Sequence, residues 1–284
     1  MNALLYQGVI KFRIKYIKMK LDDSIKKTIA YAKKHGCELN FEEIKERLIS
    51  SEVYGDEDIK KILFKNPLPD KSGFPLDEGG KLKEIKIKKA KKLALLLKKK
   101  FKNILMVGVT GSVAAGHPKK NDDIDIIIIT RKNALWQTRL KLRFFIYINQ
   151  IPHRKYGQKE NKDEFCFNFW LDEDNLLLPK SRQHLRSAVD LILMKPILNR
   201  ENTYGKFILE NSWAKKWVIN GYSKIDVRSS MLDRRNRNNY FGWVLNLLIF
   251  IPQYLFMRRK IRNEEVSLKQ AFFHTKDNHK PVKI

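Results

Sequence analysis

Residues 106–130 have the sequence MVGVTGSVAAGHPKKNDDIDIIIIT, and this stretch decides the fold. Apolar runs at 104–109 and 124–130 predict two buried strands. Between them, Gly111 and Ser112 predict a turn at the start of a short Ala/Gly helix, and a polar loop leads to Asp123. Free backbone N–H groups at a helix N-terminus can hold an anion. The predicted unit is therefore strand, anion-binding turn, loop and strand.

Asp123 and Asp125 stand at the entrance to the second strand. Side chains alternate between the faces of a strand, so these two carboxylates point the same way. At roughly 4 Å and an effective dielectric constant of about 20, their repulsion is on the order of 4 kcal/mol. A solvated acidic edge tolerates such a pair, but a divalent cation offsets the repulsion, and hard oxygen ligands suit Mg²⁺. We expect Asp123 and Asp125 to bind Mg²⁺ or Mn²⁺.

Gly111-Ser112, ten intervening residues and Asp123-Ile124-Asp125-Ile126 resemble the core motif of the DNA polymerase beta-type nucleotidyltransferase superfamily. The resemblance implies transfer of a nucleoside monophosphate from a nucleoside triphosphate (NTP) to a hydroxyl group. It also implies that Gly111 and Ser112 hold the terminal phosphates of the NTP. The basic residues expected to neutralise the triphosphate are Lys119, Lys120 and Arg139. A P-loop is excluded because His117 and Pro118 replace its Lys and Ser/Thr.

The resemblance extends, more loosely, over residues 22–220 to an uncharacterised microbial group of the superfamily. It includes Leu135–Arg139 after the second strand, Asn168–Leu171 on a third strand, and Lys195–Pro196 after a helix predicted at 181–194. This likeness implies the fold and supplies no substrate.

The third strand, 165–171, carries an unexpected residue. The superfamily usually places a third carboxylate on this strand, whereas the central residue on the predicted polar face is Asn168. Strict alternation puts Phe165, Phe167, Phe169 and Leu171 on the core face. Glu164 and Asp172 each lie about 13 Å from Asn168 along a strand. An amide cannot act as a general base, but it can ligate a metal weakly or orient a hydroxyl, so the candidate catalytic residues are Asp123, Asp125 and Asn168.

The formal net charge of +27 over 284 residues favours polyanionic partners such as RNA or DNA. A genome-wide bias towards Lys, Ile and Asn accounts for about half of this charge in our interpretation. The free thiols expected for Cys37 and Cys166 are consistent with a cytoplasmic protein. The longest apolar run, 243–257, is shorter than the roughly twenty residues that span a bilayer, so we expect no transmembrane segment. The oligomeric state stays open.

We expect an α+β fold with a small mixed sheet flanked by helices, in three regions. Residues 1–80 form a helical region that contains a capping box at Asn40 and Glu43 and a linker or wing loop at 65–80. This region is either a helix-turn-helix or winged-helix-like unit that binds nucleic acid, or a helical cap packed on the catalytic core. Residues 81–178 form the nucleotidyltransferase core, beginning with a lysine-rich helix at 82–101. Residues 179–284 are helical and end in a loose basic tail.

Two functions are compatible with these residues. The first is a Mg²⁺-dependent nucleotidyltransferase whose acceptor is RNA, a protein or a small molecule. The second is an inactive nucleotidyltransferase fold that binds nucleic acid or a protein partner. The aspartate pair and the Gly-Ser turn favour the first function, and Asn168 favours the second.

Overall fold

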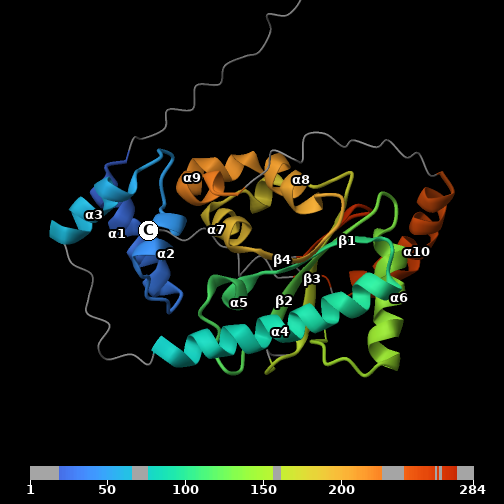
Figure 1. Ribbon diagram of the computed structural model, residues 1–284. Coiled ribbons are helices and arrows are strands. Elements are labelled where there is room, and N and C mark those ends of the chain that lie inside the picture. The colour runs from blue at the N-terminus through green and yellow to red at the C-terminus, as the bar shows by residue number, and fades with distance from the viewer. Residues whose placement is uncertain are drawn as a thin grey trace, which may run out of the picture.

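A six-stranded sheet forms the centre of the computed structural model, which describes residues 19–65, 76–155, 161–225, 240–259, 261 and 264–273 (Figure 1). In chain order the strands are β1 (Ile104–Val109), β2 (Ile124–Thr130), β3 (Phe165–Asp172), β4 (Lys195–Asn199), β5 (Glu265–Val266) and β6 (Gln270–Phe272). Their order across the sheet is β4-β1-β2-β3-β6-β5. The pairing of β2 with β3 is parallel and the others are antiparallel. The predicted α+β class is confirmed.

The two predicted strands around the Gly-Ser turn have the expected bounds. Every residue of β1 is buried, and in β2 only Asp125 is more than slightly exposed. Strands buried on both faces are continuous apolar runs rather than alternating ones, as the sequence shows here. Because β2 and β3 are parallel, the first residues of both strands lie at the same end of the sheet.

Helices cover both faces of the sheet (Figure 1). On one face, an apolar cluster joins the sheet to α4 (Leu76–Lys100), α6 (Leu135–Ile148) and α10 (Tyr240–Arg258). On the other face, a second cluster joins it to α7 (Leu185–Leu193), α8 (Thr203–Glu210) and α9 (Lys215–Ser223). Asp125 alternates with Ile124 and Ile126, which belong to the first cluster. Its side chain therefore lies on the α7 face.

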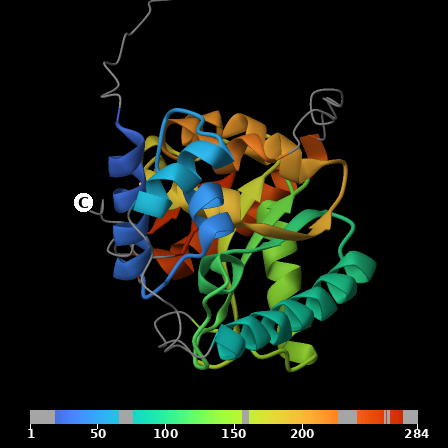
Figure 2. The ribbon, with the colours of Figure 1, turned by 60° about the vertical axis from the view of Figure 1, so that its left-hand side comes forward.

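Three N-terminal helices pack beside this layered core: α1 (Leu21–Lys34), α2 (Phe41–Arg47) and α3 (Asp56–Lys65). The predicted capping box at α2 is confirmed, since Asn40 and Glu43 each accept the other's backbone N–H. α2 contacts α9, as Figure 2 shows at the junction of the blue and orange helices. Residues 19–65 contain only an isolated bridge and no strand of a wing.

Several predicted boundaries are wrong. α4 begins at Leu76, inside the predicted linker, of which 66–75 lie outside the described residues. The helix predicted at 181–194 is a 3₁₀ turn followed by α7, and the next residues form strand β4 around Pro196. Pro196 is tolerated there because β4 is an edge strand. The part of the predicted tail at 265–272 forms β5 and β6, and β6 pairs with β3.

Candidate active site

The Gly-Ser turn lies directly against Asp125. Gly111 begins the short helix α5 (Gly111–Ala115) with a φ of +66°, a left-handed conformation that favours glycine. A Cβ atom at this position would overlap a carboxylate oxygen of Asp125. The backbone N–H of Thr110 also donates to the Asp125 carbonyl at 3.0 Å. The turn and the first residues of β2 are thus one structural unit, with no room for a side chain between them.

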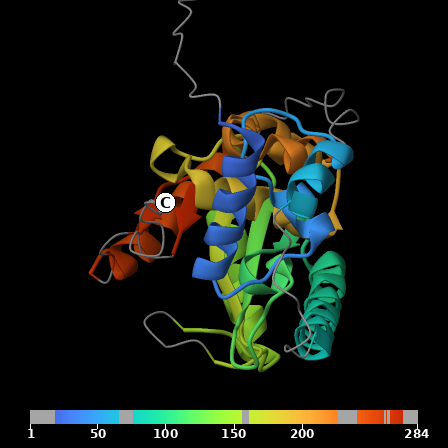
Figure 3. The same cartoon turned by 90° about the vertical axis from the view of Figure 1, so that its left-hand side faces the viewer.

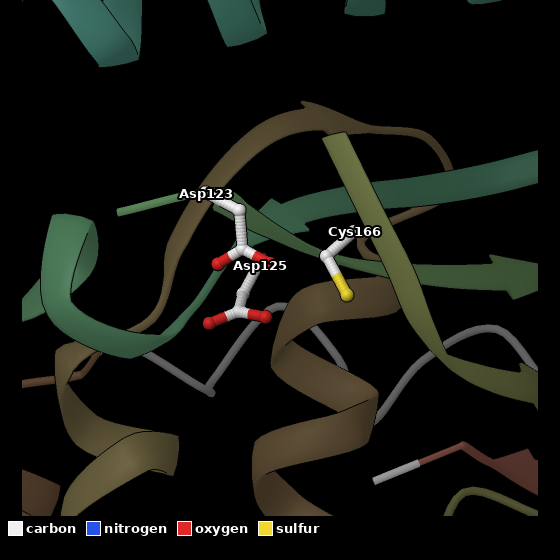
Figure 4. Close-up of side chains that lie close together, drawn as sticks. All are labelled: Asp123, Asp125 and Cys166. Carbon is white, nitrogen blue, oxygen red and sulfur yellow. The ribbon is translucent and has the colours of Figure 1, made fainter. Parts of the chain in front are cut away.

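Two carboxylates and a thiol meet where β2 and β3 begin, at one end of the sheet (Figure 4). One ligand atom each from Asp123, Asp125 and Cys166 lies within 4.8 Å of the others. In Figure 4 the carboxylate of Asp123, just before β2, and that of Asp125, on β2, lie close together, and the thiol approaches from β3. Burial, followed by the charges of Asp125 and Asp123, raises the pKa of the Cys166 thiol far above its usual range. The thiol is therefore a neutral neighbour of the two acids.

Arg154 pairs with the first aspartate. Its Nη1 donates to Oδ2 of Asp123 at 2.9 Å, and the two side chains are 24% and 5% exposed. Sequence reasoning missed Arg154, which lies in a polar loop 31 residues from its partner. An isolated bridge between His153 and Phe165 attaches that loop to β3 and so brings Arg154 to the site.

Asn168 lies beside the second aspartate. Its Nδ2 donates to Oδ1 of Asp125 at 2.6 Å and approaches the sulfur of Cys166 at 3.4 Å. Asp125 pairs with Cys166 whereas Ile127 pairs with Phe169, so β3 holds one extra residue in this interval. Such a bulge re-aims the side chains that follow it.

The strict alternation predicted for β3 is consequently wrong. Phe165 and Phe167 contact the cluster on the α4 face, whereas Phe169 and Leu171 contact the cluster on the α7 face. Trp170 joins the α4 face.

Asp172 and Glu164, the two acids that could replace a third carboxylate at Asn168, lie outside the candidate site. Asp172 is buried at the far end of β3, where its carboxylate accepts the backbone N–H groups of Asn133 and Asp174. Burial raises the pKa of Asp172 to about 7. A side-chain oxygen of Glu164 accepts from the amide of Asn161. Neither belongs to the carboxylate-thiol group among the described residues.

Hydrogen bonds to Asp122 hold the loop between the Gly-Ser turn and Asp123 in place. Ser112 Oγ donates to Oδ2 of Asp122 at 2.6 Å, and the backbone N–H of Lys119 donates to the same oxygen at 2.9 Å. Lys119 and Lys120 are exposed on this loop. From α4, the buried Lys86 donates to the Asp122 carbonyl at 2.6 Å. The loop holds Ser112 next to the acids and leaves both predicted lysines accessible to an incoming anion.

Arg139 does not join these residues. It is 9% exposed on α6, on the opposite face of the sheet, where it donates to Gln253 at 2.8 Å and packs over the ring of Phe273. Burial, with a smaller contribution from Arg143, lowers the pKa of Arg139 to about 9. Its surroundings identify it as a link between α6 and α10, in place of the predicted contact with a triphosphate.

A pocket of about 190 Å³ opens beside the Gly-Ser turn, between the N-terminal helices and α7. Gly111 and Ser112 line one end of the pocket. Tyr31 and His35, whose ring centroids are 4.7 Å apart, line it from α1 and its C-terminus, and Arg186 and Asp190 belong to α7. The wall thus combines aromatic rings, charged groups and the turn.

α2 is attached to the same turn. Arg47 donates to the Ala115 carbonyl at 2.7 Å, and Glu43 lies 3.2 Å from a ring nitrogen of His117. Burial opposes ionisation of Glu43, but hydrogen bonds from His117 and the Asn40 backbone, with the Arg47 charge, lower its pKa to about 2. The N-terminal helices are therefore fixed against α5 by charged contacts and form part of the site.

Comparison with known families agrees with this geometry. Residues 90–181, from α4 to the loop after β3, match a family model described as a nucleotidyltransferase domain. Residues 90–181 therefore form a nucleotidyltransferase domain that matches the DNA polymerase beta-type superfamily. No curated protein and no solved structure matches the chain.

The donor set fits a divalent cation. Two carboxylates converge at the Gly-Ser turn, and positive partners already approach them in the form of the Arg154 guanidinium and the Asn168 amide hydrogens. Hard carboxylate oxygens suit Mg²⁺ or Mn²⁺, whereas a protonated thiol is a poor ligand for either ion. Asp123 and Asp125 would therefore hold the ion, and Cys166 would border it.

Proposed function

We propose that this protein is a Mg²⁺- or Mn²⁺-dependent nucleotidyltransferase that moves a nucleoside monophosphate from an NTP to a hydroxyl acceptor. The observation that carries the proposal is the contact between Gly111 and Asp125. It puts a turn suited to phosphates against a carboxylate pair suited to a cation, which is the combination that phosphoryl transfer requires.

Each residue of the site then has a defined task. The turn at Gly111 and Ser112 binds the terminal phosphates through backbone N–H groups, and the Ser112 hydroxyl reaches them by leaving its bond to Asp122. Lys119 and Lys120 approach from the exposed loop. Asp123 and Asp125 hold the metal, which neutralises charge on the phosphates. Asn168 fixes the orientation of Asp125 and takes no proton.

The pocket next to the turn is the proposed site of the nucleoside. Tyr31 and His35 offer ring faces to a base, and Arg186 and Asp190 offer hydrogen bonds. Pockets that enclose drug-sized ligands measure roughly 300–1,000 Å³, so a pocket of about 190 Å³ takes only part of a nucleotide. The phosphates would remain at the open end, beside Ser112.

Because the chain has a net charge of +27, we propose RNA or DNA as the acceptor, in the cytoplasm. The first experiment incubates the protein with each NTP, Mg²⁺ and total RNA, and measures pyrophosphate release and label transfer. Asp123→Asn and Asp125→Asn should each abolish transfer. Undiminished transfer in both variants would disprove the metal site.

The second candidate is an inactive nucleotidyltransferase fold that binds nucleic acid or a protein partner. Two contacts favour it: Asn168 occupies the place of an acid, and Arg154 pairs with Asp123. This candidate predicts NTP or RNA binding without pyrophosphate release under any metal. Titration calorimetry beside the transfer assay distinguishes the two functions.

A further inference from the structure

α10 directs its polar side chains towards the protein. The fully buried Asn246 accepts the backbone N–H of Trp136 at 2.8 Å. Gln253 accepts from Arg139 at 2.8 Å and donates to the Trp136 carbonyl at 3.2 Å. Asn246 and Gln253 are seven residues apart, two helical turns, so they form one stripe that faces α6. The side-chain oxygens of Asn246 and Gln253 thus both accept hydrogen bonds from α6.

The outward face of α10 is apolar. We define the α10 face by six exposed side chains: Phe241, Val244, Leu248, Ile251, Leu255 and Phe256. Phe241 is 79% exposed and Phe256 is 67% exposed. Surface helices of globular proteins have the opposite arrangement, with polar residues outward. Contiguous exposed apolar surface of this kind marks an interaction site.

By length and composition alone, α10 could also cross a membrane, and no other helix of the described residues could. The apolar run 243–257 alone predicts no transmembrane segment, because it is too short. The helix that contains this run is longer, with 19 residues. At 1.5 Å per residue it is about 28 Å long. A spanning position would require the bonds of Asn246 and Gln253 to α6 to break, leaving both amides in hydrocarbon. A position along a bilayer surface would leave both of these bonds intact.

Charge identifies the kind of surface. The sequence from Tyr240 to Met257 contains no charged residue, and it is bounded by Arg234, Arg235 and Arg237 before it and by Arg258, Arg259 and Lys260 after it. α6 adds two exposed cations, Lys141 and Arg143, and no acid. Apolar faces with basic flanks bind in the headgroup region of anionic bilayers. A second copy of the chain would instead bring together two molecules that each have a net charge of +27.

We propose that the α10 face docks onto an anionic lipid bilayer, with α10 lying in the plane of the interface. In Figure 1, α6 and α10 lie at the end of the molecule opposite α1 to α3, and Figure 3 shows α10 on the outside of the fold. Docking through this face therefore leaves the pocket between α1 and α7 open. This proposal is independent of the proposed transfer reaction.

The test is flotation with vesicles of phosphatidylcholine alone and with phosphatidylglycerol added. A double variant, Leu248→Glu with Phe256→Glu, puts two acids on the α10 face. The matched control, Val53→Glu with Phe64→Glu, makes the same charge change at side chains that are 65% and 90% exposed among the N-terminal helices. Circular dichroism and thermal melting verify that each variant is folded.

The wild type and the control should partition onto the anionic vesicles and only weakly onto phosphatidylcholine. Burying each Leu or Phe contributes at least about tenfold, so the α10 double variant should bind about a hundredfold less. Equal loss in both double variants would overturn the proposal, because charge alone would then explain binding. A wild-type dimer that ignores vesicles and dissociates in the α10 variant would also overturn it, and would assign the face to self-association.

Discussion

The pair between Arg154 and Asp123 gives the sharpest test of the metal site. Replacing Arg154 with Met keeps an apolar stem and removes the guanidinium from a carboxylate that is 5% exposed. At 2.9 Å and an effective dielectric constant of about 20, the attraction lost is about 6 kcal/mol. Solvent screening at the 24% exposed Arg154 reduces the net cost to about 2–4 kcal/mol. The variant should therefore melt roughly 5–15 °C lower in EDTA.

Divalent cations should reverse this loss. In the wild type, Mg²⁺ must displace the guanidinium from Asp123, whereas in Arg154→Met this competitor is absent. A metal concentration a hundredfold above the dissociation constant contributes about 2.7 kcal/mol of stability. We expect millimolar Mg²⁺ to raise the melting temperature of the variant by several degrees more than that of the wild type.

Arg131 provides the matched control, because it pairs with Glu201 through side chains that are 29% and 36% exposed. Arg131→Met should cost at most about 1 kcal/mol, and Mg²⁺ should not change that cost. Differential scanning calorimetry of all three proteins, with EDTA and with Mg²⁺, makes the comparison. If Mg²⁺ shifts the wild type and Arg154→Met equally, Asp123 does not bind the ion.

Three further substitutions test the neighbouring contacts. Gly111→Ala should lower nucleotide transfer at least about a hundredfold, because the left-handed φ and the Asp125 carboxylate leave no place for a Cβ. Gly79→Ala in α4 is the control in the same transfer assay, because a Cβ at Gly79 would meet no other atom within 4 Å. Asn168→Asp replaces a 2.6 Å hydrogen bond with repulsion, so its melting temperature should fall in EDTA and largely recover in Mg²⁺, and Asn168→Ala should show no such recovery. The folded pKa of Glu43, about 2, lies below its ordinary 4.5, so this carboxylate stabilises the fold above pH 4.5 and loses that effect as the pH falls towards 2. Urea unfolding should show Glu43→Gln to be less stable at pH 7, with the difference closing over that interval; a difference independent of pH would exclude the carboxylate charge as its cause.

Local signals predicted local structure. The apolar runs of β1 and β2 and the capping box of α2 depend on residues within a few positions of one another, so the sequence was sufficient. The bulge in β3 depends on the strand beside it, and no periodicity within residues 165–171 indicates it. Strand β6 is short and takes its place only because β3 offers a free edge. These features are set by tertiary pairing, which overrides local preference.

In the candidate site, too, the sequence predicted the contacts that depend on local spacing and missed those that depend on tertiary structure. The spacing of the Gly-Ser turn and the aspartates implies their proximity, and the structure brings Gly111 against Asp125. The sequence predicts Arg139 at the site as a basic residue that follows β2, but its side chain lies on the other face of the sheet. Arg154 had no sequence signal, since a cation in a polar basic loop is unremarkable until the loop is placed beside β3.

The charge balance of the site connects Arg154 with the missing third acid. Asp123 and Asp125 contribute two negative charges, Arg154 contributes one positive charge, and Cys166 and Asn168 are neutral, so the formal sum is −1. A third carboxylate at Asn168 would make the sum −2 and would attract a divalent ion more strongly without any ligand. With the present residues, the ion gains most when the anionic triphosphate arrives with it and offers Arg154 an alternative partner. We therefore expect Mg²⁺ and NTP to bind cooperatively in the wild type. The cooperativity should be smaller in Arg154→Met, where the sum is already −2 before the nucleotide binds.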